Sequence, residues 1–324
     1  MAGAAVVSHM RGASTLPIEA TAMLDVVFSS VVPVLCTIVL GFLWVRFGRA
    51  LDSKVLTPIV VDVGTPCLIV STLLKAEIAP EAFATVALAS CVAIVAFAAI
   101  GVLVLWSLGL PLRTYLPSIA FPNAGNLGLP LALYAFGPEG LGYAIVFFAI
   151  SSIGNHSIGQ ALAAGTINWK TFARMPMLYA IAIGMAGAYF HIKPPSWFGN
   201  TLGLVGNLTI PVMLLMLGGT LARLQIATLS RAIGLSALRI GAGGVIGAIV
   251  ANLFHLPETA RAVLILQCAM PVAVYCYLYA ERWQCDPEEV AGLVFLSTAV
   301  SIITVPALLS ILTLPRGVFN GIAF

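Results

Sequence analysis

Long runs of apolar residues follow one another along almost the whole chain, and only short polar segments separate them. Hydrophobic residues make up 60% of the 324 residues and charged residues only 8%, with a mean hydropathy of +1.07. A helix needs about 20 apolar residues to cross a bilayer, so the chain has room for roughly ten crossings. We predict them at 24–45, 55–75, 82–108, 116–136, 141–165, 176–191, 200–222, 232–254, 260–281 and 289–313. The sequence therefore predicts an all-α polytopic membrane protein.

The remaining polar residues exclude several classes of function. The net charge of +3 falls mainly in loops, and no basic patch suited to nucleic acid is present. The sequence has no Ser/His/Asp grouping, metal-ligand spacing or phosphate-binding glycine loop. We therefore expect that the protein is not an enzyme, binds no cofactor and does not use ATP to drive transport. Five of the six cysteines lie in apolar runs and none forms a Cys-x-x-Cys pair, which predicts neither disulfides nor a metal site.

The two ends of the chain and its basic residues indicate an orientation. Residues 1–22 form a less apolar N-terminal tail, and residues 315–324 form a C-terminal tail. The apolar run after residue 22 is long enough to span and lacks a convincing cleavage site, which favours a tail over a cleaved signal. With the N-terminus outside, nine Lys and Arg residues fall in cytoplasmic loops and five outside. The positive-inside rule then predicts both termini outside the cytoplasm, in a cell inner membrane.

The two halves of the chain resemble each other. Three pairs of segments align: 32–41 with 175–184 at an offset of 143 residues, 62–66 with 207–211 at 145, and 137–139 with 286–288 at 149. Coincidence among apolar segments is the alternative, but aligned prolines and glycines favour a duplication. Five spans per copy is an odd number, so the second copy enters the membrane inverted, as in many transporters. We expect repeat 1 at 23–165, a short cytoplasmic loop at 166–175 and repeat 2 at 176–314.

The fourth predicted span contains an unusual segment, Phe-Pro-Asn-Ala-Gly-Asn-Leu-Gly-Leu-Pro, at 121–130. Pro122 and Pro130 cannot donate backbone hydrogen bonds, and such backbone is tolerated at membrane depth only if protein buries it or it lines a cavity. The ninth span places Pro271 at the equivalent position. An ordinary proline kink is the alternative, and for the ninth span alone it would suffice.

Two broken helices would bring two half-helix N-termini to one cavity. Their free N–H groups and positive dipole ends favour an anion, particularly a carboxylate. Neutral hydrogen-bonding groups in the same segments are Asn123, Asn126 and Gln267.

Two titratable side chains are candidates for proton coupling. Asp62 is the one acid deep within a predicted span, where an ionised carboxylate costs about 3 kcal/mol or more unless it faces water or protein. A proton-carrying role and a satisfied structural role beside Pro66 are equally open. His156 in the fifth span can also titrate, although its small polar neighbours favour helix packing as the alternative. We expect Tyr275 to wall a pocket, and Arg239 to snorkel to the cytoplasmic face.

Three motifs carry a resemblance: Pro122-Asn-Ala-Gly-Asn-Leu-Gly-Leu-Pro130, Ala269-Met-Pro271 and Leu296-Ser-Thr-Ala-Val-Ser-Ile-Ile-Thr-Val-Pro306. From Met23 to about Leu314 the chain resembles the auxin efflux carrier family, specifically its short prokaryotic members. The resemblance implies ten spans as two inverted five-helix repeats, broken crossover helices 4 and 9, and a fold related to bile-acid/sodium symporters. It also implies a scaffold of the first, second, sixth and seventh spans that often dimerises, and a transport domain of the other six that moves in elevator fashion.

The resemblance further implies where a substrate binds. The crossover of the fourth and ninth spans would hold its carboxylate, and the candidate substrate-binding residues here are Pro122, Asn123, Gly125, Asn126, Gln267, Pro271 and Tyr275. Val272 stands where the repeat would place a second asparagine, so recognition is expected to be asymmetric. Similar bacterial proteins are associated with small carboxylates such as malate or malonate.

The leading hypothesis is a secondary active transporter of a small organic anion that works by alternating access, with proton coupling through Asp62. Its expected partners are the lipid bilayer, the carboxylate substrate and a second copy of the chain in a homodimer. A sodium-coupled symporter ranks second, because sodium sites need clustered oxygens and acids are scarce here. A passive channel or a membrane sensor is the alternative from another class, and the inverted repeats favour a carrier over both.

Overall fold

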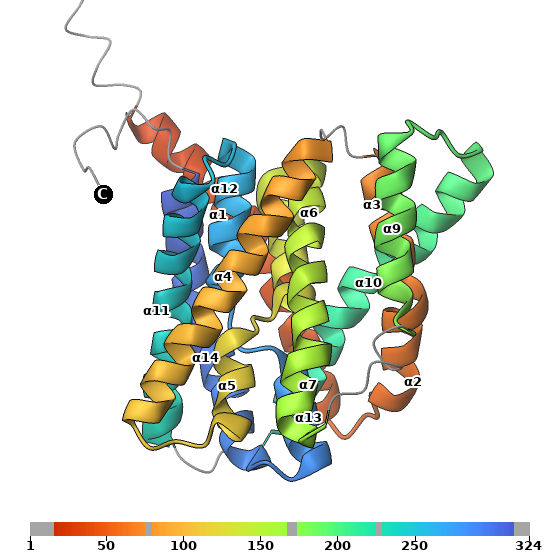
Figure 1. Ribbon diagram of the computed structural model, residues 1–324. Helices are drawn as coiled ribbons and strands as arrows, with labels where there is room; N and C mark the ends of the chain where they lie inside the picture. The colour runs from red at the N-terminus through yellow and green to blue at the C-terminus, as the bar shows by residue number, and fades with distance from the viewer. Residues whose placement is uncertain (1–15, 76–79, 167–173, 225–228, 314–324) are drawn as a thin grey trace, which may run out of the picture.

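The computed structural model describes residues 16–75, 80–166, 174–224 and 229–313, and these residues are helical almost throughout (Figure 1). Within these ranges there is no β-strand, and a single isolated antiparallel bridge joins Pro122 and Val272. Most of the predicted loop at 166–175 and all of the predicted C-terminal tail lie outside the described ranges. The predicted all-α class is confirmed.

The first half of the chain contributes the following helical segments, where η marks a π-helix: α1 (Leu16–Arg46), α2 (Ser53–Pro58), η1 (Ile59–Gly64), α3 (Thr65–Lys75), α4 (Pro80–Ser107), α5 (Leu112–Ala120), η2 (Ala124–Gly128), α6 (Leu129–Gly154), η3 (Asn155–Gly159) and α7 (Gln160–Ala164). The second half contributes α9 (Pro176–Tyr189), α10 (Ser196–Leu221), α11 (Leu229–Leu253), α12 (Glu258–Cys268), α13 (Val274–Trp283) and α14 (Pro287–Leu312). Helix α1 begins at Leu16, inside the segment predicted as a tail, and Pro17 in its first turn removes no helical hydrogen bond.

Seven helical segments of the described chain are long and apolar enough to cross a membrane: Val27–Arg46, Val55–Lys75, Glu81–Ser107, Ala124–Ala164, Ser196–Leu221, Arg231–Leu253 and Pro287–Leu312. Pro176–Tyr189 is a shorter apolar helix. Large apolar side chains such as Leu40, Leu103 and Ile303 are exposed on these helices, as expected of surfaces that face lipid rather than water. The chain is therefore a multi-pass membrane protein.

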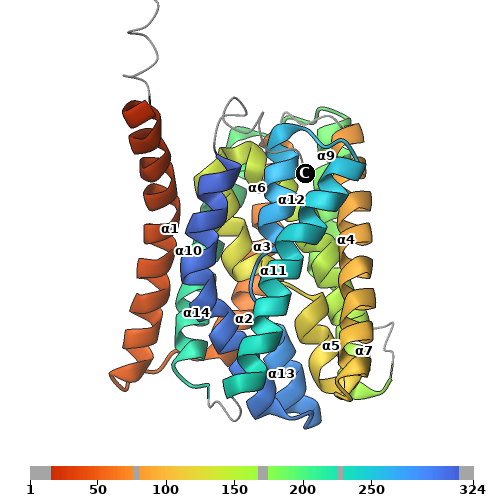
Figure 2. The same cartoon turned by 90° about the vertical axis from the view of Figure 1, so that its left-hand side faces the viewer.

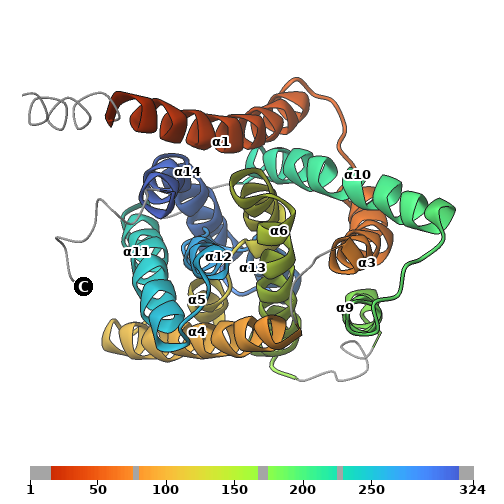
Figure 3. The same ribbon diagram turned by 90° about the horizontal axis from the view of Figure 1, so that it is seen from above.

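The helices form two groups when the molecule is seen from above (Figure 3). In one group, here called the edge group, α1 packs on α10, α10 on α3 and α3 on α9, with α2 and η1 leading into α3. The other group, here called the inner group, consists of α4, η2, α11, α14 and α5–α7, together with α12 and α13. Figure 2 shows α1 at the outer edge, beside α10 and α14. Helices α1 and α10 approach closely because Gly41 and Gly218 each lie against the partner helix's backbone.

Candidate functional site

Two of the non-helical segments in the inner group pair with each other. Helix α5 ends at Ala120 and η2 begins at Ala124, while α12 ends at Cys268 and α13 begins at Val274. The backbone N–H of Asn123 donates to the carbonyl of Pro271 at 2.7 Å, and that of Ala273 donates to the carbonyl of Phe121 at 3.2 Å. Each break thus supplies the hydrogen bonds that the other lacks, which is how irregular backbone is tolerated inside a membrane protein.

The break in the fourth span is short. The extended part covers only Phe121–Asn123, and the chain re-enters a helix at Ala124. Pro130 lies at the start of α6 and is accommodated there, because η2 immediately before it is wider than an α-helix and bonds Gly128 N–H to the carbonyl of Asn123 at 3.1 Å. Pro130 therefore belongs to a helix, and the break ends before it.

Two amide side chains at the crossover are buried without protein partners. Asn123 is 4% exposed and Gln267 is 0% exposed. The Nδ2 of Asn123, and both Oε1 and Nε2 of Gln267, have no hydrogen-bond partner among the described residues. The Gln267 amide lies against Gly128, where a Cβ would overlap it. Because buried polar groups are nearly always satisfied, these atoms are expected to bind water or a ligand that reaches the crossover.

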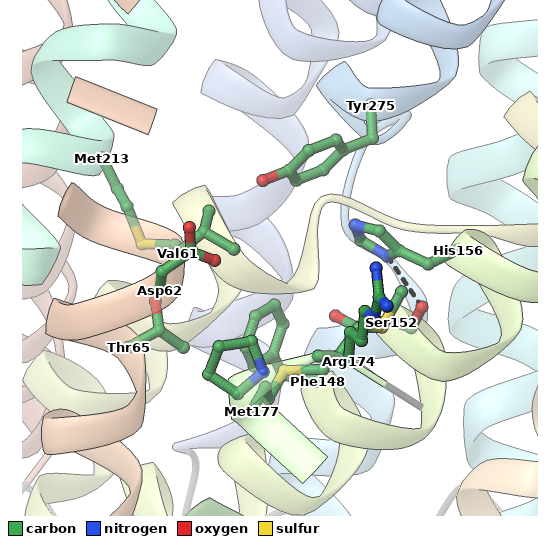
Figure 4. A pocket seen from close by; sticks show the side chains of 12 residues that line it. Val61, Asp62, Thr65, Phe148, Ser152, His156, Arg174, Met177, Met213 and Tyr275 are labelled. Carbon is green, nitrogen blue, oxygen red and sulfur yellow. Dashed lines mark hydrogen bonds between the residues drawn. The ribbon is translucent and has the colours of Figure 1, made fainter. Parts of the chain in front are cut away.

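A cavity of about 560 Å³ lies between the edge group and the inner group (Figure 4). Asp62 of η1, His156 of η3 and Tyr275 of α13 share it, and Arg174 lies just before α9 at one side. Its other lining residues are Val61, Thr65, Phe148, Ser152, Met175, Pro176, Met177 and Met213. The structure therefore brings both predicted coupling residues and the predicted pocket tyrosine to one place, within the volume range of small-molecule sites.

The orientation of His156 follows from its hydrogen bond. Its Nδ1 lies 2.9 Å from the carbonyl of Ser152, so Nδ1 carries the hydrogen and donates. The Nε2 of the neutral ring is then the atom left to accept a proton. The imidazole packs beside Tyr275, with ring centroids 4.9 Å apart, which holds the ring at the cavity wall.

The remaining predicted residues do not line this cavity. Asn126 and Tyr275 line a smaller cavity of about 70 Å³ together with Val274, and this smaller cavity shares Val61, Met213 and Tyr275 with the larger one. Gly125 contacts Phe148, because a Cβ there would come 2.7 Å from the ring. The predicted residues that line neither of these two cavities are Pro122, Asn123, Gly125, Gln267 and Pro271.

The helix starts that meet near Asn126 have no side-chain caps. Neither η2 nor α13 receives a side-chain hydrogen bond at its N-terminus within the described chain. Val274 is the first residue of α13 and Asn126 lies in the first turn of η2, and both line the small cavity. The free N–H groups and positive dipole ends of two helices thus adjoin one space, which favours an anion there.

Sequence reasoning missed one local feature of the site. The three π-helical segments of the described chain are η1, η2 and η3, and they hold Asp62, Asn126 and His156 respectively. π-Helical turns are often found at functional sites. Arg174 was also missed as a cavity residue, because its position before Pro176 marked it as an ordinary loop cation.

Burial corrects the expectation for Arg239. Its side chain is 0% exposed and does not snorkel to either face. Its guanidinium instead lies over the ring of Phe97, 4.1 Å from Cζ to the ring centroid. Arg239 lies near the middle of α11, too far from the helix ends for its side chain to reach a polar surface.

Long apolar helices, paired chain breaks and a cavity with a few polar groups define a polytopic membrane protein of the transporter class. The sequence profile of the family described as "Membrane transport protein" matches residues 26–166 and 160–309. The chain therefore belongs to this family, the auxin efflux carrier family that its motifs resemble. It is a membrane transporter rather than an enzyme.

Two archaeal relatives are named as transporters. A protein of Methanothermobacter thermautotrophicus named "Uncharacterized transporter" is 24% identical over 291 residues, which cover 86% of this chain and 95% of the relative. A protein of Methanocaldococcus jannaschii named "Uncharacterized transporter MJ1031" is 25% identical over 209 residues, which cover 56% of this chain and 63% of the relative. Both likenesses extend over more than half of the chain.

Proposed function

We propose that this protein is a secondary transporter of a small organic carboxylate, working by alternating access with proton coupling. The observation that carries the proposal is the small cavity at Asn126 and Val274, where the uncapped starts of η2 and α13 adjoin one space. Helix N-termini stabilise an anion without a buried basic residue in contact with it. The small cavity shares lining residues with the cavity of Asp62 and His156, so a proton site and an anion site would lie side by side.

An arrangement of ten crossings as two inverted repeats accounts for the geometry. Helix α6 contains one non-helical residue, Gly137 (φ 65°, ψ −161°), and dividing the helix there separates a fourth from a fifth crossing. The aligned residue in the second half, Asp286, also has a positive φ of 47° and directly precedes α14. A proline follows each of them, Pro138 and Pro287. A residue with positive φ followed by a proline at the same place in both halves supports a duplicated unit.

The two repeats also account for a third cavity. A space of about 330 Å³ is lined by Lys75, Asn207, Ile210 and Leu68, among others. At the repeat offset of 145 residues, Asn207 corresponds to Asp62, Ile210 to Thr65, and Leu68 to Met213 of the larger cavity. We assign the larger cavity to the cytoplasmic side and this one to the outside, with both termini outside and the membrane a cell inner membrane.

The edge group would be the scaffold and the inner group the moving transport domain. Both cavities lie where the two groups meet, as an elevator movement requires. Exposed apolar residues of α1, including Phe28 and Leu40, offer a surface for a homodimer through the scaffold.

Flux into proteoliposomes tests the proposal. Purified protein is reconstituted with a pH gradient in sodium-free buffer, and uptake of labelled malate and malonate is measured. A carrier gives saturable uptake and counterflow driven by the pH gradient, a channel gives neither saturation nor counterflow, and a sensor moves nothing. Uptake that requires sodium would show that the coupling ion is sodium and not a proton.

Asn123→Ala should abolish uptake while the exposed Asn200→Ala should not. Near-normal uptake by Asn123→Ala would contradict the crossover assignment.

A further inference from the structure

Arg239 carries a charge for which the described residues offer no polar partner. It is the largest fully buried side chain described, and none of its three guanidinium nitrogens has a hydrogen-bond partner within the described ranges. The contact over Phe97 offsets only part of the cost of removing an ion from water. A side chain so placed within a membrane-spanning helix calls for a functional reason.

Arg239 lies near the carboxyl end of α12. Gly243, one helical turn further along α11, contacts the carbonyl of Cys268, the last residue of α12. Gly247, another turn along, lies against Ile265, so α11 follows α12 and continues past its end towards Arg239. The thiol of Cys276 in the first turn of α13 also lies within electrostatic range of the guanidinium.

Arg239 also lies near the carboxyl end of α5. The guanidinium covers Phe97 of α4, and Gly101, one turn further along α4, lies against Leu116 and Ile119 of α5. Helix α5 ends at Ala120, one residue beyond Ile119. The cation thus approaches the crossover from the side of α4 and α11. Neither of these helices lines the Asp62 cavity.

The carboxyl ends of helices carry partial negative charge and carbonyls without helical partners. Pro122 adds to this at α5, because it has no N–H to donate to the carbonyl of Ser118. In transporters with broken helices, such ends are where a coupling sodium ion or proton binds. A guanidinium supplies the same positive charge through a covalent tether and stays charged at any physiological pH.

We propose that Arg239 is a tethered cation that stabilises the two converging carboxyl ends in place of a bound sodium ion. The amino ends of the crossover are then left for the substrate anion, and the crossover is assembled without sodium. The consequence for transport rests on the proposed function, whereas the structural role of Arg239 does not. Arg239 is a positioning residue here, because it lies behind the substrate cavities and does not line them.

Thermal unfolding of the detergent-solubilised full chain tests this role independently of transport. Arg239→Gln, Arg239→Lys and the exposed control Arg46→Gln are compared with the wild type in choline chloride, sodium chloride and low millimolar guanidinium chloride. We expect the same unfolding midpoint for the wild type and the control in choline and in sodium. Arg239→Gln should have a lowered midpoint that sodium or guanidinium partly restores, and Arg239→Lys should lie close to the wild type.

Three results would overturn the proposal: specific stabilisation of the wild type by sodium, a wild-type midpoint for Arg239→Gln, or a lowered midpoint that no cation restores. If Arg239→Gln does not fold, Arg239→Lys decides the question. Lysine satisfies a requirement for positive charge, whereas it does not satisfy a requirement for the shape of the arginine side chain. Uptake assays on the same preparations separate the two proposals. Absence of carboxylate uptake by the wild type contradicts the proposed function, while the unfolding midpoints still decide the role of Arg239.

Discussion

Gly243 offers a sharp test of how closely α11 must approach the crossover. A Cβ at this position would overlap the carbonyl oxygen of Cys268 and come 2.9 Å from its carbonyl carbon and 3.0 Å from the Cα of Ala269. All three atoms are backbone, so no side-chain rotation relieves the overlap. A Cβ at the neighbouring Gly244 would meet nothing within 4 Å. Gly243→Ala and Gly244→Ala therefore form a matched pair in one helix.

The expected difference follows from two opposing effects. Replacing glycine by alanine within a helix gains up to about 1 kcal/mol through helix propensity, and this gain is common to both variants. Forcing an extra group into a packed interior costs about 1–3 kcal/mol, and only Gly243→Ala bears this cost. The free energy of unfolding should thus be about 1–3 kcal/mol lower for Gly243→Ala than for Gly244→Ala, a roughly 5- to 150-fold shift in the folding equilibrium.

Equilibrium unfolding in mixed detergent and dodecyl sulfate micelles measures this difference, with transport activity as a second readout. Displacement of the last turn of α12 by Gly243→Ala should also reduce uptake, because that turn holds Gln267. Equal unfolding free energies for the two variants would refute the reasoning, since they would show that α11 and α12 can separate freely at the crossover.

Three further predictions concern the cavities and the crossover. Asp62→Asn should make uptake independent of pH. Glu81 is an exposed carboxylate in the first turn of α4, and Glu81→Gln should leave the pH profile of uptake unchanged. An unaltered pH profile for Asp62→Asn would assign Asp62 a structural role. Gly128→Ala should lower the unfolding free energy by about 1–3 kcal/mol and weaken uptake, because its Cβ would overlap the buried amide of Gln267, and wild-type uptake would show that this amide can move aside. Arg174→Gln should weaken the apparent affinity for the carboxylate when substrate is presented from the Arg174 side of oriented vesicles, and high salt should reduce the difference from the wild type.

Local patterns were enough to predict most of the membrane-spanning helices. The predicted spans 82–108, 232–254 and 289–313 match α4, α11 and α14 closely, because each is a continuous apolar run whose length alone marks it. The two breaks were also predictable, since Pro122 lies in a segment rich in asparagine and glycine and Pro271 aligns with it in the second half. The extent of the first break was not predictable, because it depends on the π-helical turn of η2 and on pairing with residues about 150 positions away.

The sequence by itself determined that the chain is helical, crosses a membrane several times and belongs to a transporter family, because these properties follow from hydrophobic length, proline chemistry and local motifs. Only the tertiary structure decided that Asp62 and His156 face one cavity, that Asn123 and Gln267 are buried without partners, and that Arg239 is enclosed rather than at a surface. Within an apolar span a polar residue looks the same whether it faces a neighbouring helix, a cavity or lipid. Its environment is fixed by helices far away in the chain, which hydropathy and spacing do not describe.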